Sequence, residues 1–123
     1  MSISKSYTSS FNKIQIEIDE YNCDITKRIK ELDVSVKLNQ ISKKECMNEV
    51  KLIREDIKIS ENLISNLEQI LPYIESSLTE QSKNVIVSDK ENCRQHKLKI
   101  KSYEMIVSSN AYINKYKERE ENL

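Results

Sequence analysis

The side chains that could perform acid–base or nucleophilic chemistry are few and widely spaced in this chain. His96 is the only histidine, and it has neither a second histidine nor an adjacent cysteine to complete a metal site or a catalytic pair. The three cysteines, Cys23, Cys46 and Cys93, are odd in number and form no CxxC pair, which indicates neither a zinc site nor a disulfide framework. We expect reduced thiols on or beside the helix seams, and a histidine in the core or at its edge.

The acidic residues also lack the spacing of a reactive site. Glu55 and Asp56 are adjacent, so on a helix their side chains point about 100° apart, which suits neither a shared proton nor a bound metal. The sequence contains no EF-hand loop, no phosphate-binding loop and no glycine with which to build one. We therefore predict a protein that is not an enzyme and has no catalytic residue, cofactor, metal or small-molecule substrate.

Six tyrosines raise the question of a binding surface. Four of them fall at seam positions, where an aromatic ring is expected to fill the core. Tyr73 and Tyr112 are expected to be the freer two.

Composition favours an all-α fold of one domain. The 123 residues include no glycine and one proline, and tight hairpin turns depend on glycine or on an Asn-Gly pair, which is also missing. Apolar residues make up 37% and charged residues 33%, which is typical of long helices that bury one narrow stripe.

Charge and hydropathy narrow the classes of partner. Twenty basic and twenty acidic residues balance, and the cations are interleaved with anions, so we expect no nucleic-acid partner. The longest apolar run, residues 70–74, is too short to cross a membrane, and the first five residues do not resemble a signal peptide. We expect this chain to be soluble, to face the cytosol and not to insert into a membrane.

The first long helix is predicted at about residues 7–34. Apolar residues from Tyr7 to Leu32 recur at steps of four and three, which places them on one stripe of a helix. Residues 1–6 are serine-rich and are expected to fray, with Ser4 or Ser6 available as the N-cap.

Two further helices are predicted from capping-box patterns, in which a serine precedes a glutamate by three residues. Ser42 begins a helix of about residues 42–78, kinked near Pro72 because proline lacks the N–H that a helix requires. Ser88 begins a third helix of about residues 88–117, with Asp89 in its first turn, where the helix dipole favours negative charge. Residues 118–123 form a charged tail.

The predicted architecture is an antiparallel, up-down-up three-helix bundle with long helices, spanning residues 7–117. Each connection of about nine residues is too short to cross the length of such a bundle, so consecutive helices should be antiparallel. The predicted core seam contains Tyr7, Phe11, Ile14, Ile18, Tyr21, Ile25, Ile29, Leu32, Val50, Ile53, Ile57, Ile64, Leu67, Leu71, Ile100, Tyr103 and Ile113.

Short motifs in all three predicted helices resemble one known family. Tyr7 and Phe11 are similar to the Tyr-x-x-x-Phe opening of the N-terminal domain of Vti-type vesicle SNAREs. Residues 61–68 resemble a pattern in that family's second helix. In this pattern an acidic residue is followed by a pair of apolar residues, and then by an apolar residue next to an acidic one. Residues 101–103 fall where its third helix carries a basic residue, serine and tyrosine.

This resemblance implies an Habc-like recognition domain that precedes a coiled-coil SNARE motif and a C-terminal membrane anchor. In that family the domain is bound by ENTH domains of epsin-related clathrin adaptors, which sort the SNARE into vesicles that move and fuse between Golgi and endosomes. The implied location is the cytosolic face of those membranes, and other SNAREs would bind through the absent C-terminal region. The expected connection at residues 79–87 is long for the family, and we expect an excised domain. The family's motifs mark no adaptor-contacting residue, so the partner-binding residues are unknown.

Two alternatives remain open. Residues 56–58, followed by Pro72 and Leu78, look like a pattern of tubulin-binding cofactor A, which implies a cytosolic three-helix chaperone that captures β-tubulin. The other alternative is a structural helical subunit of a larger complex.

Overall fold

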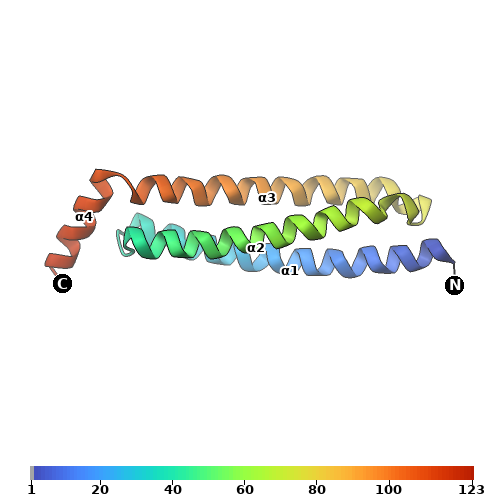
Figure 1. The fold of residues 1–123 in the computed structure, drawn as a ribbon, viewed down its shortest axis with the longest axis horizontal. Coiled ribbons are helices and arrows are strands. Elements are labelled where there is room, and N and C mark those ends of the chain that lie inside the picture. The colour runs from blue at the N-terminus through green and yellow to red at the C-terminus, as the bar shows by residue number, and fades with distance from the viewer. Residues whose placement is uncertain (1) are drawn as a thin grey trace.

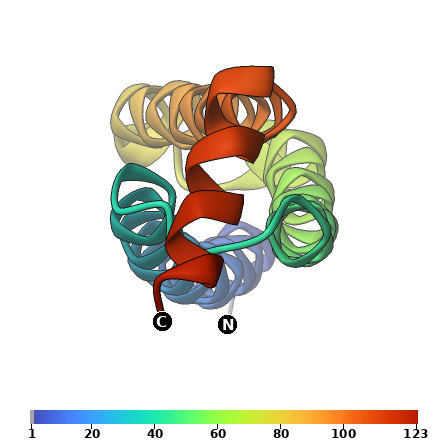
Figure 2. The same ribbon diagram turned by 90° about the vertical axis from the view of Figure 1, so that its left-hand side faces the viewer.

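The computed structural model describes residues 2–123, and within that range it is helical and contains no strand. The all-α prediction is therefore confirmed. Figure 1 shows the long helices of the chain side by side, and Figure 2 shows the C-terminal helix lying across their end. The helices are α1 (Ile3–Lys37), α2 (Lys43–Ile70), α3 (Thr79–Val107) and α4 (Asn110–Glu121).

Helix α1 begins earlier than the sequence pattern predicts. Ser2 is its N-cap and accepts a hydrogen bond from the N–H of Lys5 at 3.3 Å, so the expected frayed segment is helical from Ile3 onward; Met1 lies outside the described residues. Two contacts hold these first turns against the connection between α2 and α3. The rings of Tyr7 and Tyr73 lie 5.2 Å apart, and the N–H of Glu75 donates to Thr8 Oγ1 at 3.1 Å.

Helix α1 ends in a Schellman motif. Asn39 adopts φ 54°, a left-handed conformation that asparagine tolerates better than most residues. The N–H groups of Asn39 and Gln40 donate to the carbonyls of Val36 and Ser35. The helix thus extends to Lys37, three residues beyond the predicted end, and buries Val36 in its last turn.

The predicted capping box starts α2. Ser42 Oγ accepts from the N–H of Glu45 at 3.1 Å, and Glu45 Oε1 accepts from the N–H of Ser42 at 3.2 Å. This pair satisfies two N–H groups that the first turn of a helix leaves without intrahelical partners.

The prediction of a kinked helix through Pro72 is wrong, because α2 ends at Ile70. Pro72 has no N–H for the carbonyl four residues earlier, and Ile74 is extended (ψ 170°). The chain then turns through two 3₁₀ segments, Leu71–Tyr73 and Ser76–Leu78.

Helix α3 begins at Thr79, nine residues before the predicted start at Ser88. The buried residues of its first turns continue the four-three spacing of the helix backwards, at Ser82, Ile86, Asp89 and Cys93. The Ser88 pattern therefore lies inside a helix rather than at its N-terminus, and a capping-box sequence alone cannot distinguish the two.

The prediction of a single third helix is also wrong, because the chain leaves helical geometry at Ser109 (ψ 145°), the N-cap of α4. In a continuous helix, Tyr112 would point about 140° away from Val107 and into solvent. The break instead buries Tyr112, whose hydroxyl donates to the carbonyl of Ile41 at 2.7 Å. Tyr112 thus belongs to the core, and the seam residue predicted beside it, Ile113, stays partly exposed.

A matched pair of substitutions on α1 tests this division between core and surface. Ile18 is 2% exposed and Ile16 is 58% exposed, although they are two residues apart on one helix. We expect Ile18→Ala to lower the free energy of unfolding by about 2–5 kcal/mol, because it leaves a cavity in the core. Ile16→Ala should change it by less than about 0.5 kcal/mol. Urea unfolding followed by circular dichroism measures both, and equal losses would contradict the assignment.

Candidate functional site

The predicted seam residues come together in one elongated core between α1, α2 and α3. Tyr7, Ile14, Tyr21 and Leu71 are partly buried and pack against this core. The predicted residues that are fully buried in it are Phe11, Ile18, Ile25, Ile29, Leu32, Val50, Ile53, Ile57, Ile64, Leu67, Ile100 and Tyr103.

A ladder of three ion pairs joins α2 to α3. Arg54 pairs with Glu104, Glu61 with Lys97 at 2.5 Å, and Glu68 with Lys90 at 2.8 Å. Each step of seven residues forward along α2 is a step of seven backward along α3, so the two helices run antiparallel. The side chains of the last two pairs are 38–53% exposed, and exposed pairs contribute little stability. They mark the register between the two helices.

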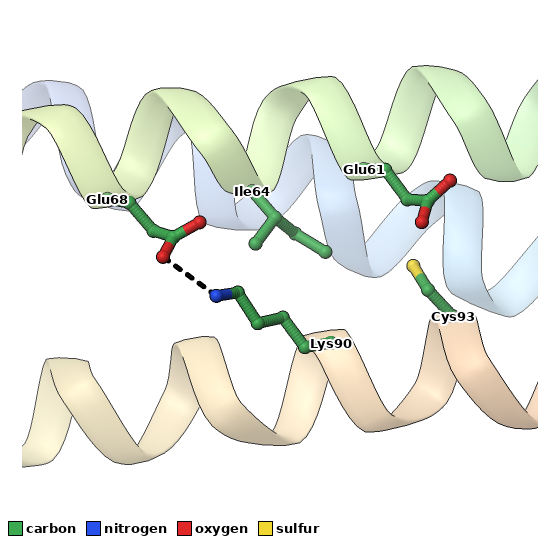
Figure 3. A pocket seen from close by; sticks show the side chains of 5 residues that line it. All are labelled: Glu61, Ile64, Glu68, Lys90 and Cys93. Atoms are coloured by element: carbon green, nitrogen blue, oxygen red, sulfur yellow. Dashed lines mark hydrogen bonds and ion pairs between the residues drawn. The ribbon is translucent and has the colours of Figure 1, made fainter.

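A small cleft of about 230 Å³ lies between two steps of this ladder. Figure 3 shows Glu61, Ile64 and Glu68 from α2 facing Lys90 and Cys93 from α3. Burial raises the pKa of the Cys93 thiol, which lies 3.9 Å from Ser60 Oγ. The charged side chains around this thiol are paired with one another, and the raised pKa favours its protonated form. Cys93 is therefore poorly suited to nucleophilic chemistry.

A second row of polar contacts joins α1 to α3. Asn22 Oδ1 lies 2.8 Å from His96 Nε2, and the Tyr103 hydroxyl donates to Asp33 Oδ1 at 2.7 Å. One seven-residue step before the Asn22–His96 pair, Gln15 lies beside Asp89. Residue numbers rise together on both helices along this row, so α1 and α3 run parallel.

His96 occupies the edge of the core. Burial lowers the pKa of its imidazole, which favours the neutral form. Because Asn22 Oδ1 can only accept, the imidazole carries its proton on Nε2 and donates it to Asn22. This bond makes His96 a link between α1 and α3.

Asp89 is the residue that sequence reasoning placed most wrongly. The sequence pattern predicts Asp89 in the first turn of a helix, but it lies well inside α3 and is 7% exposed. Burial raises the pKa of its carboxyl, the Gln15 side chain lowers it in part, and the Asp19 carboxylate raises it further. Among residues 2–123, Asp89 Oδ2 and the neighbouring Gln15 Oε1 are the buried side-chain oxygens without a hydrogen-bond partner. The four-three spacing from Ser82 through Cys93 is the sequence signal that could have revealed its burial.

Arg28 forms the polar link between α1 and α2. Its guanidinium contacts Asp56 at 2.5 Å and Glu49 at 3.3 Å on α2, and Asp24 at 3.4 Å on its own helix. Asp56 is the acid whose pairing with Glu55 was considered for chemistry, and here it binds an arginine instead.

Two further properties hold for residues 2–123. Within that range no group of three or more histidine, cysteine or acidic side chains is placed to hold a metal ion. None of the described helices combines the length and apolar character needed to cross a membrane.

Comparison of the chain with models of protein families, with curated proteins and with solved structures finds no match.

The buried Asp89 carboxyl predicts a specific dependence of stability on pH. Because its pKa is raised in the folded state, its stabilising contribution is complete below about pH 4 and is lost as pH rises through the folded pKa. Asp89→Asn removes this titration and supplies an amide that can donate to Gln15. At pH 7 we expect the variant to be more stable than the parent chain by about 1–2 kcal/mol, with the difference shrinking towards pH 4.

Urea unfolding between pH 4 and pH 8 measures this difference, in which the titration of His96 cancels because both chains contain it. Glu20→Gln, at an exposed position of α1, is the matched control and should leave the pH dependence unchanged. A difference between Asp89→Asn and the parent chain that does not vary with pH would contradict the assignment.

Proposed function

We propose that this chain is the N-terminal recognition domain of a vesicle SNARE of the Vti type, with an up-down-up three-helix arrangement to which α4 is added. In this role an ENTH domain of an epsin-related clathrin adaptor binds the domain on the cytosolic face of Golgi and endosomal membranes. The domain itself performs no catalysis and acts in vesicle transport and membrane fusion through protein contacts.

The observation that carries the proposal is the seven-residue register of the polar contacts. The ladder Arg54–Glu104, Glu61–Lys97 and Glu68–Lys90 supports an antiparallel arrangement of α2 and α3. The α1–α3 row supports a parallel arrangement of those two helices. These directions are the ones that an Habc-like domain requires.

The residues that carry the family resemblance have structural roles consistent with it. Phe11 and Tyr103 are buried in the core, and Tyr7 packs against Tyr73. The long connection that counted against the family is not present, because residues 79–87 belong to α3. The chain passes from α2 to α3 through residues 71–78 alone.

The residues on which the tubulin-binding alternative depends have structural roles in the fold. Asp56 binds Arg28, Ile57 is buried in the core, and Pro72 follows the end of α2. No feature within residues 2–123 specifically favours capture of β-tubulin.

Calorimetric titration of the purified chain with an ENTH domain of an epsin-related adaptor, and separately with β-tubulin, tests the proposal. We expect binding to the ENTH domain with a dissociation constant of roughly 1–100 μM, as is usual for transient protein contacts, and no heat from β-tubulin. The ENTH domain of a plasma-membrane adaptor is the matched control partner and should bind at least about tenfold more weakly. Binding to β-tubulin without binding to the ENTH domain would overturn the proposal.

A further inference from the structure

The face shared by α2 and α3 changes character near α4. A shallow cleft of about 510 Å³ lies there, at the end of the molecule opposite the first turn of α1 (Figure 1). It is lined by Met47, Arg54, Lys101, Glu104, Met105 and Ser108.

Two methionines give this cleft an exposed apolar surface. Met47 on α2 is 36% exposed, and Met105 on α3 is 67% exposed. Methionine side chains are unbranched and polarizable, so they adapt to apolar side chains of different shapes. The two neighbouring helices α2 and α3 therefore both contribute apolar surface to the cleft, and apolar side chains of a partner can pack on it.

The charge around the two methionines is positive and largely uncompensated. Met47, Lys51, Arg54 and Lys58 follow one another on α2 at steps of four, three and four, which places them on one face of the helix. Lys101 lines the cleft from α3. Among residues 2–123, no ion pair involves Lys51, Lys58 or Lys101.

Further along the bundle, the lysines on the same face are paired with acidic residues. There Lys97 and Lys90 are paired with Glu61 and Glu68. Near α4, the one acid that lines the cleft, Glu104, already pairs with Arg54. Of the unpaired lysines, Lys101 lines the cleft together with the methionines, and Lys51 and Lys58 follow Met47 along the same face of α2.

We propose that this methionine–lysine face, formed by Met47, Lys51, Lys58, Lys101 and Met105, binds an acidic amphipathic helix of a partner protein. The apolar side of that helix packs on the two methionines, and its carboxylates contact the three lysines. Such a helix in a groove, complementary in both hydropathy and charge, is a recurring mode of peptide recognition. The inference deepens the proposed role in protein recognition and rests on it.

The probe is a fluorescein-labelled, amidated 18-residue peptide with leucine at helical steps of three and four and glutamate or glutamine elsewhere. Its control carries lysine in place of each glutamate. The chain contains three methionines, so ¹³C-labelled methionine methyl groups give three signals, assigned with Met47→Leu and Met105→Leu. On addition of the acidic peptide we expect the Met47 and Met105 signals to shift, and the control peptide to shift neither.

Charge reversal separates specific docking from general attraction. Lys58→Glu combined with Lys101→Glu should weaken peptide binding at least about tenfold by fluorescence anisotropy. Lys13→Glu combined with Lys27→Glu, at exposed positions of α1, makes the same change in net charge and should leave the affinity within about twofold. Circular dichroism confirms that both variants keep the helical fold before they are compared.

Three results would overturn the inference: no binding of the acidic peptide at 1 mM or below, equal weakening by both double variants, or unchanged Met47 and Met105 signals at saturation. Binding of phosphatidylserine vesicles or of duplex DNA through Lys58 and Lys101, without peptide binding, would also overturn it. The experiments distinguish failure of this inference from failure of the proposed function. Peptide binding without ENTH binding would reject the SNARE assignment alone, and ENTH binding that survives Lys58→Glu/Lys101→Glu would reject this face alone.

Discussion

The structure depends on one constraint, that three long helices must bury narrow apolar stripes against one another along their whole length. Each of these helices depends on the others, because a helix in a folded protein gains most of its stability from the tertiary packing of its apolar face. When apolar residues recur at steps of three and four, the residues that flank the stripes on neighbouring helices come into contact once every seven residues. The α2–α3 ion pairs and the α1–α3 polar contacts occupy those flanking positions.

The apolar stripes could be read from the sequence because their spacing is a local property. The predicted stripe residues from Phe11 to Leu32 and from Val50 to Leu67 are buried or partly buried, and the Ser42 cap starts α2. The start of α3 was missed because the stripe passes there through Ser82 and Asp89, which are polar. The break before α4 was missed because it is decided by the packing of Tyr112 on the end of the bundle, a contact with Ile41 that local sequence does not encode.

The polar contacts could not be predicted because their partners are far apart in the chain. Arg28 and Asp56 are 28 residues apart, and Asn22 and His96 are 74 apart. The same limit applies to the methionine–lysine face, since Met47 and Met105 come from different helices and become neighbours only through the α2–α3 register. Once the register is known, the unpaired lysines stand out because the neighbouring steps of the ladder are neutralised.

The parallel register between α1 and α3 determines which side chains of these two helices meet, such as Asn22 and His96. Double electron–electron resonance between spin labels on exposed positions of a Cys23→Ser chain tests it most directly. Labels at residues 13 and 87 should lie closer together than labels at 13 and 105, because 18 further residues of α3 add about 27 Å along the axis. A longer distance for 13 and 87 than for 13 and 105 would contradict it.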